Sequence, residues 1–132
     1  MKITADTNVL ARAILQDDPA QCQTARKLLK GATLIAVSLP SLCELVWILQ
    51  QGAKLEKQDV AAAIRALLDA GNVVMNRQAV EAGLALLEAG GDFADGIMAY
   101  EGRWLGGETF VSFDKKAVKL LSEQGEATEL LS

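Results

Sequence analysis

Four acidic side chains stand at comparable places in the 132-residue sequence, each near the start of a predicted helix: Asp6, Glu44, Asp95 and Asp114. The chain has no histidine, so the commonest general base and the usual zinc sites are excluded. Carboxylate oxygens without histidine or thiolate partners favour Mg²⁺ or Mn²⁺ over zinc. The four acids therefore predict a divalent metal site, provided that they meet in the folded chain.

Such a site suits the hydrolysis of phosphodiester bonds. Magnesium is held by few carboxylates and keeps several waters, which leaves positions for phosphate oxygens. A water activated by the ion can attack phosphorus in line, while the same or a second ion stabilises the leaving 3′ oxygen. The acids themselves need not be nucleophiles.

Helix capping is the simpler explanation for each acid taken alone, because helix N-termini favour Asp and Glu. Asp6 and Asp114 each directly precede a predicted helix. The stretch SLCE at 41–44 matches the capping-box pattern, and Asp92 is the expected cap of the helix in which Asp95 lies one turn further on.

Glu44 favours the metal over the caps. In LCELVWIL, residues 42–49, it is the one residue that is not apolar, and a helix that is apolar all round is expected to be buried. A buried carboxylate needs a cation, a dense set of hydrogen bonds or a metal. No Lys or Arg lies within a turn of Glu44, and Asp6, beyond the adjacent strand, is another acid. A divalent ion would relieve their repulsion.

The elements that must position these acids alternate between short apolar strands and helices. Strands are predicted at 2–5, 33–38, 72–75, 109–113 and, more weakly, 127–131, and helices at 7–16, 20–30, 40–51, 56–70, 78–89, 92–104 and 115–124. This alternation predicts an α/β fold with a parallel sheet and helices on both faces. In such sheets, ligands bind beyond the carboxyl ends of the strands, which is where the acids fall.

Length and composition predict one domain spanning residues 1–132, with 51% hydrophobic residues and a core that needs no disulfide or structural metal. Cys22 and Cys43 have no metal-like spacing and are expected to be reduced thiols in or near the core. No apolar run reaches the roughly 18 residues of a membrane span, and no secretory signal is recognisable. We therefore expect a cytoplasmic protein that does not enter membranes.

The net charge of −4 argues against a nucleic-acid partner, because such proteins usually carry a basic surface. The charge is uneven, however. Residues 1–66 carry eight basic and six acidic side chains, a net +2, whereas residues 67–132 carry five and eleven, a net −6. Two bound divalent ions would bring the whole chain close to neutrality, which weakens the objection.

Four stretches of the sequence resemble the acidic motifs of PIN-domain ribonucleases, in particular the VapC-like toxins of type II toxin-antitoxin pairs. They are ADTNVL at 5–10, LPSLCELVWIL at 39–49, GGDFADGIMA at 90–99 and VSFDKKAVKL at 111–120. Their order, spacing and surrounding residue types agree over nearly the whole chain. The resemblance implies a three-layer α/β/α fold with a sheet of four to five parallel strands in the order 3-2-1-4-5.

The same resemblance implies a Mg²⁺- or Mn²⁺-dependent endoribonuclease whose acidic residues are the four named above. Asn8 matches the polar position that supports the first acid, and Ser112 stands where the family often has threonine. VapC-like toxins form homodimers and are held inactive by an antitoxin whose C-terminal segment covers the groove. RNA, an antitoxin and a second copy of the chain are therefore the expected partners.

Other side chains allow a functional and a structural interpretation. Four basic residues could guide phosphates or could be solvated surface charges: Arg12, Arg103, Lys115 and Lys116. Trp47 and Trp104 could stack on bases, although packing in the core or at an interface explains them more simply. Small residues in the helix at 92–104 are expected to let it approach its neighbours closely: Ala94, Gly96, Ala99 and Gly102.

Two other functional classes remain open. A receiver-like phosphoacceptor also uses a parallel sheet and an acidic Mg²⁺ pocket, but it normally needs an adjacent acidic pair after the first strand, where Asp6 is followed by Thr7 and Asn8. A noncatalytic binding subunit could keep the fold without the chemistry.

Overall fold

The computed structural model describes all residues from Met1 to Ser132 and divides the chain into two compact units, Met1–Asn76 and Arg77–Ser132. The single domain expected over residues 1–132 stays a prediction. No helix in either unit combines the length and apolar character that crossing a membrane requires.

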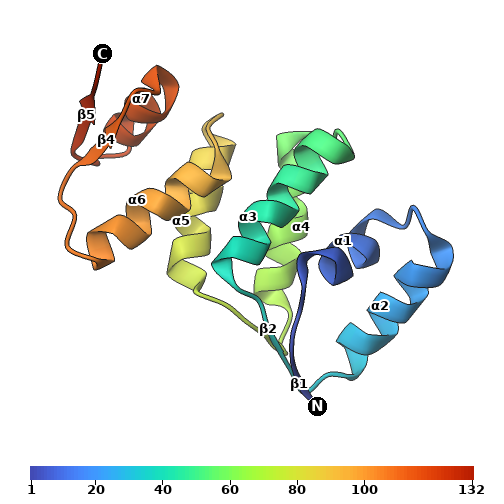
Figure 1. The fold of residues 1–132 in the computed structure, drawn as a ribbon. Coiled ribbons are helices and arrows are strands. Elements are labelled where there is room, and N and C mark those ends of the chain that lie inside the picture. Colours follow the sequence, from blue (N-terminus) through green and yellow to red (C-terminus); the bar gives the residue numbers. More distant parts are fainter. The chain divides into compact units, whose positions relative to one another are not determined.

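The first unit contains a parallel sheet and its connecting helices (Figure 1). In chain order its elements are β1 (Lys2–Thr4), α1 (Thr7–Leu15), α2 (Pro19–Gly31), β2 (Leu34–Ala36), α3 (Leu39–Trp47), η1 (Ile48–Gly52), α4 (Lys57–Asp69) and β3 (Val73–Val74). The strands pair in the order β1-β2-β3, with Ile35 of β2 opposite Ile3 on one side and Val73 on the other. The predicted alternation of strands and helices is confirmed here.

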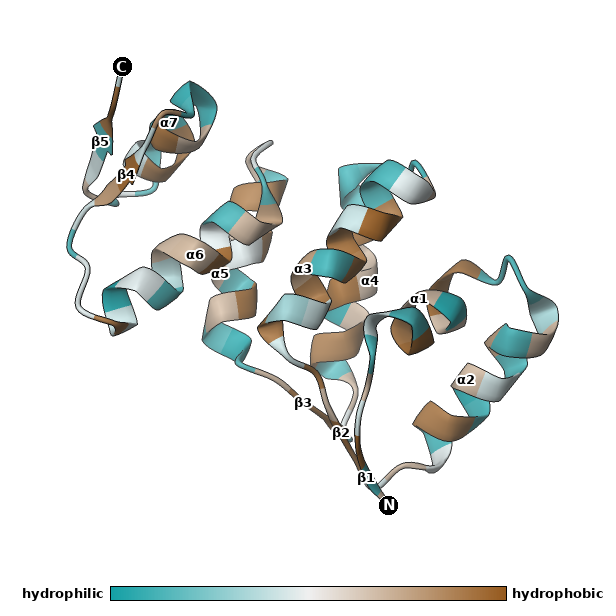
Figure 2. Ribbon diagram, viewed as in Figure 1, coloured by the Kyte–Doolittle hydropathy of each residue, from teal (hydrophilic) through white to brown (hydrophobic).

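Local sequence signals explain where these helices begin and end. Asp18 caps α2 by accepting a hydrogen bond from the Gln21 backbone N–H at 3.1 Å, and Pro19 occupies the first turn, where its missing N–H costs nothing. The helix α1 ends at Gln16, whose φ of 58° is left-handed. The strands are largely hydrophobic, whereas α2 alternates between hydrophobic and hydrophilic residues (Figure 2).

The core of the first unit lies where α3 and α4 bring their apolar faces together with the sheet. Its deeply buried members include Leu10, Ile35, Leu42, Leu45, Leu49, Val60 and Ile64. The helix predicted over 40–51 differs from the observed one in its last turn, because α3 ends at Trp47 and continues as the π-helical turn η1. The Ala53 N–H donates to the Ile48 carbonyl at 3.0 Å, five residues back, and Leu49 stays fully buried.

The second unit pairs two helices with a short two-stranded parallel sheet. Its elements are α5 (Arg77–Glu88), α6 (Phe93–Trp104), β4 (Phe110–Ser112), α7 (Lys115–Glu123) and β5 (Thr128–Leu130). Val111 of β4 lies opposite Glu129 of β5. The weakly predicted last strand is therefore confirmed, and the strand order inside each unit agrees with 3-2-1-4-5. That β1 neighbours β4 stays a prediction.

Two glycines allow α5 and α6 to pack closely. A Cβ added to Gly83 of α5 would lie 2.8 Å from the Phe93 ring, which is 1% exposed, and one added to Gly96 of α6 would lie 2.6 Å from the Ala82 carbonyl oxygen. The expected close approach is confirmed at Gly96. It is wrong at Gly102, where an added Cβ would meet nothing within 4 Å.

Replacing Gly96 by alanine is expected to lower the free energy of unfolding by about 1–3 kcal/mol, because the backbone of α5 would have to move away from the new methyl group. Gly102→Ala is the matched control on the same helix and is expected to stabilise the protein by up to about 1 kcal/mol through helix propensity. Urea unfolding of both variants, followed by circular dichroism, measures the difference. Equal stabilities would contradict the packing described here.

Candidate functional site

In the first unit, Asp6 stands at the junction between β1 and α1. Its backbone is extended, and its Oδ1 accepts a hydrogen bond from the Thr7 N–H at 2.9 Å. The side chain is exposed, and its second carboxylate oxygen has no protein partner. Asp6 is therefore a helix cap that also keeps one oxygen available for a ligand.

The start of α1 is tied to the start of α3. Thr7 is 3% exposed, and its Oγ1 donates a 3.4 Å hydrogen bond to the Ser41 carbonyl. The two helices that carry Asp6 and Glu44 therefore begin next to each other. Asn8, in the first turn of α1, is exposed and makes no hydrogen bond with Asp6, so its supporting role stays a prediction.

Glu44 is exposed, and the prediction that it is buried is wrong. The helix α3 does have an open face, because Trp47, one turn beyond Glu44, is 64% exposed. The apolar sequence around Glu44 predicts a helix buried on all sides, and the exposure of Trp47 shows that this expectation does not hold. The cost of burying a charge therefore gives no support to a metal at Glu44.

The capping-box interpretation of residues 41–44 is also wrong. The cap of α3 is Ser38, whose Oγ accepts from the Ser41 N–H at 3.3 Å, while Ser41 lies inside the helix. Glu44 consequently falls in the second turn and forms neither a hydrogen bond nor an ion pair with the protein.

The second unit holds an acidic group around the start of α6. Asp92 caps this helix by accepting from the Ala94 N–H at 2.8 Å, as expected from the sequence. Asp95, half-buried in the first turn, has no hydrogen bond or ion pair. Its burial raises the pKa of the Asp95 carboxyl above the ordinary value of 3.8, and the charges of Asp92 and Asp114 raise this pKa further.

Asp114 is presented by the turn between β4 and α7. Its Oδ1 accepts from the Ala117 N–H at 3.1 Å and so caps α7, while its own N–H donates to the Ser112 Oγ at 3.0 Å. The Ser112 hydroxyl thus shapes the turn on which Asp114 stands. Like Asp6, Asp114 uses one oxygen as a cap and keeps the other available.

The basic side chains named from the sequence differ in their surroundings. The Arg12 Nη1 contacts both carboxylate oxygens of Asp17 at 3.1 Å, and the Arg103 Nη2 lies 3.3 Å from Glu126 Oε1. Lys115 and Lys116 are exposed at the start of α7, beside Asp114, without an ion pair. Of the four, these two lysines are therefore the ones without an acidic partner and remain available to an incoming phosphate.

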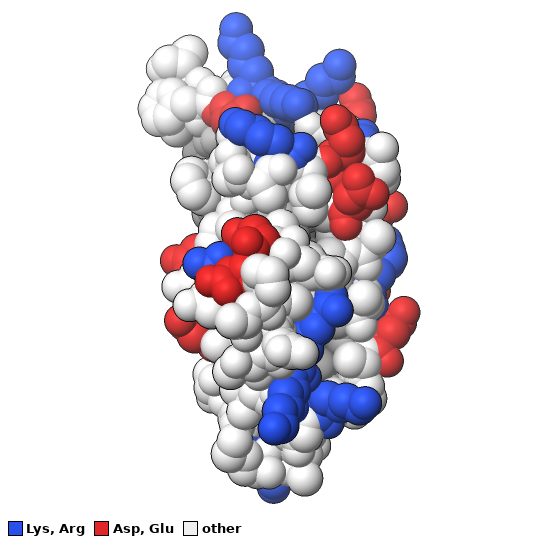
Figure 3. Space-filling model, turned by 90° about the vertical axis from the view of Figure 1, so that its right-hand side faces the viewer, with Lys and Arg blue, Asp and Glu red and all other residues white.

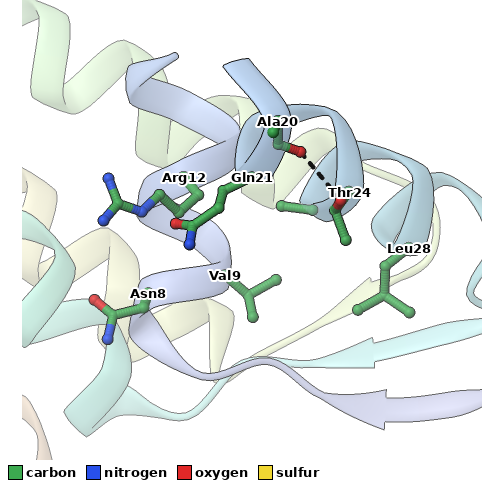
Figure 4. Close-up of a pocket in the computed structure, with 8 residues that line it drawn as sticks. Asn8, Val9, Arg12, Ala20, Gln21, Thr24 and Leu28 are labelled. Carbon is green, nitrogen blue, oxygen red and sulfur yellow. Dashed lines mark hydrogen bonds between the residues drawn. The ribbon is translucent and has the colours of Figure 1, made fainter. Parts of the chain in front are cut away.

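One pocket of about 570 Å³ lies entirely within the first unit, between α1 and α2 (Figure 4). Sequence reasoning named two of its lining residues, Asn8 and Arg12, and missed those of α2, above all Gln21 and Thr24. The sequence signal for the pocket is the set of small residues Ala20, Thr24 and Ala25 on one face of α2, where a helix packed tightly against its neighbour would carry large apolar residues.

Divalent metal ions fit the chemistry of these side chains, although neither unit alone gathers three or more metal-ligating side chains into a finished site. Asp95 lies near two other carboxylates and has no cationic partner, so negative charge there is uncompensated. A divalent ion reverses the sign of such an interaction. Carboxylate oxygens are also the ligands that Mg²⁺ and Mn²⁺ prefer.

The raised pKa of Asp95 makes folding stability depend on pH. At a pH between the pKa of Asp95 in the unfolded chain and its higher pKa in the folded chain, the folded state binds more protons. The contribution of Asp95 to stability is therefore present at low pH and is lost as the pH rises through the folded pKa. In EDTA, Asp95→Asn should therefore gain stability relative to the natural chain as the pH rises above about 4, the ordinary carboxyl pKa, and the gain should level off once the pH exceeds the raised pKa of folded Asp95. Urea unfolding across this range measures the effect.

Glu101→Gln is the control, because it removes an exposed acid from the same helix. If both variants changed stability in the same way, the loss of net negative charge alone would account for the effect.

Comparison with known proteins places this geometry in a family. A search of curated proteins finds no match. The family model described as the PIN domain matches residues 3–120, a span that includes all four acids. PIN domains have a three-layer α/β/α fold with a parallel sheet and are generally metal-dependent nucleases. With most of its length matched, the chain belongs to the PIN-domain family.

Proposed function

We propose that the protein is an endoribonuclease that depends on Mg²⁺ or Mn²⁺ and is the toxin of a toxin-antitoxin pair. The observation that carries the proposal is the uncompensated carboxylate of Asp95, close to Asp114, in a chain that belongs to a family of nucleases. Family membership favours this reaction over phosphoacceptance by a receiver-like domain.

Asp6 and Glu44 of the first unit, together with Asp95 and Asp114 of the second, would hold the metal. Glu44 and Asp95 have both carboxylate oxygens free, while Asp6 and Asp114 each have one oxygen that is not used in capping. A divalent ion held by these carboxylates would supply activation of a water for attack on phosphorus and stabilisation of the charge on the leaving oxygen.

The chain's own residues orient the substrate and the ligands. Lys115 and Lys116 attract a phosphate to the start of α7, beside Asp114, where the helix N-terminus also favours negative charge. The Ser112 hydroxyl fixes the turn that presents Asp114. The hydrogen bond from the Thr7 hydroxyl to the Ser41 carbonyl joins the start of α1, which Asp6 caps, to the first turn of α3, the helix that carries Glu44.

Exposed apolar side chains support the proposed protein partners, a second copy of the chain and an antitoxin. Trp47 of the first unit is 64% exposed, and in the second unit Trp104 is 74% and Leu105 88% exposed. This exposure removes the core-packing interpretation of both tryptophans. The neighbouring exposed side chains of Trp104 and Leu105 suit a contact with a protein partner. Expression of the natural chain in the cytoplasm should arrest growth, and Asp6→Asn should relieve the arrest. Unimpaired growth with the natural chain would contradict the toxin role.

RNA cleavage tests the catalytic proposal. A single-stranded RNA pool should be cut in Mg²⁺ or Mn²⁺ and left intact in EDTA, and both Asp6→Asn and Asp95→Asn should cut roughly a hundredfold more slowly or worse, the scale of losing one electrostatic contact to a transition state. Asp69→Asn, which changes an exposed acid at the end of α4, is the matched control and should cut normally. Undiminished cleavage by Asp6→Asn would end the assignment.

A paramagnetic metal tests whether acids from both units serve one ion. Substoichiometric Mn²⁺ added to the ¹⁵N-labelled protein should broaden the backbone amides of Thr7 and Gly96, each of which follows a proposed ligand. Mg²⁺ is the diamagnetic control and should broaden neither. Broadening confined to one of the two units would show that the four acids do not share a site.

A further inference from the structure

The pocket between α1 and α2 is lined by both apolar and polar side chains. Its apolar lining comes from Val9 of α1 and from Ala20, Ala25 and Leu28 of α2, while Asn8, Arg12, Gln21 and Thr24 supply its polar groups. The volume of about 570 Å³ falls within the range of pockets that enclose small ligands.

The pocket exists because α2 carries small residues on the face that it turns toward α1. Ala20, Thr24 and Ala25 leave space that leucines would fill. Beyond the pocket the two helices are fastened together, because the Arg26 Nε donates a 2.9 Å hydrogen bond to the Ala13 carbonyl. The hollow is therefore held open by a fixed helical hairpin.

The polar groups lining the pocket have hydrogen-bonding capacity to spare. The side-chain amides of Asn8 and Gln21 are exposed and make no hydrogen bond within the protein. Arg12 contacts Asp17 through Nη1 alone, so its other nitrogens remain available. In Figure 4 the polar ends of Asn8, Arg12 and Gln21 lie toward one end of the pocket, and Thr24, whose hydroxyl donates to the Ala20 carbonyl at 3.0 Å, lies toward the other.

The charge of the surrounding surface suits a polyanion. The helix α2 contains no Asp or Glu and exposes Arg26, Lys27 and Lys30. On the face shown in Figure 3, Lys and Arg side chains lie over the lower part of the surface and also at its upper end. Inside the pocket the charge of Arg12 is balanced by Asp17. The interior is therefore suited to an uncharged group, while its basic surroundings suit a phosphate backbone.

We propose that this pocket binds one unpaired nucleobase of the RNA substrate and sets a base preference near the cut, an inference that rests on the proposed nuclease function. Asn, Gln and Arg side chains read the hydrogen-bonding edges of bases, and the apolar wall formed by Val9 and Leu28 covers the faces of the ring. Asn8 lies in the first turn of α1, two residues after the capping Asp6, so a base held here would lie near the bond that is cut.

The deciding variant is Gln21→Leu, which keeps the size of the side chain but removes its amide. Gln23→Leu is the matched control, because Gln23 is also exposed on α2 but does not line the pocket. Sequencing the ends of a cleaved random RNA pool should show a base preference at one position near the cut. Gln21→Leu should weaken this preference by about fivefold or more, and Gln23→Leu should leave it unchanged. Cleavage without any preference, or one unaffected by Gln21→Leu, would overturn the proposal.

A measurement without cleavage separates this inference from the nuclease function. Short homopolymeric ribo-oligonucleotides, added in EDTA to the ¹⁵N-labelled natural chain, should shift the amides of Thr24 and Leu28 more strongly for one base than for the others. Absence of such shifts would overturn the base pocket even if RNA is cleaved. Their presence would support the pocket even if no RNA is cleaved and the nuclease proposal fails.

Discussion

A carboxylate placed where a parallel strand turns into a helix is the constraint on which the candidate site depends. Asp6 and Asp114 each accept a hydrogen bond from a backbone N–H of the helix that follows, and such a cap stabilises the start of a helix by about 1 kcal/mol. The same bond fixes the position of the carboxylate and leaves one oxygen free. Capping and metal binding, which compete as explanations of the sequence, are compatible uses of one side chain.

Asp95 differs from these two acids, because its carboxylate has neither a hydrogen-bond donor nor a cationic partner in the protein and its pKa is raised. It is half-buried, lies near Asp92 and Asp114, and has no hydrogen-bond donor of its own. Functional sites often retain groups that destabilise the folded state when no ligand is bound. The metal-free protein therefore carries its electrostatic strain at α6, and not at Glu44, where the apolar sequence around the residue had suggested it.

Much of the fold could be predicted because its signals are local. Gly and Pro mark the ends of α2, and short apolar runs mark the strands, so the observed elements follow those expected. Side-chain exposure depends on tertiary packing and is harder to predict from the sequence. The sequence of α3 is apolar around Glu44, and only the packing of the helix shows that the face with Trp47 is exposed. The pocket could not be predicted either, since it depends on how far two helices stand apart.

The contact between α5 and α6 has a consequence for how the protein can evolve. Gly83 accommodates the Phe93 ring and Gly96 meets the backbone of α5, so α6 can neither rotate nor slide without a collision. The position of Asp95 is thus set by the packing of α6 on α5, which the hydrogen bond from the Tyr100 hydroxyl to Gln78 Oε1 supports, while the Asp95 carboxylate itself has no hydrogen-bond partner. A side chain introduced at either glycine would shift α6 and with it Asp95. These two positions should therefore tolerate substitution poorly, although neither glycine is a proposed ligand.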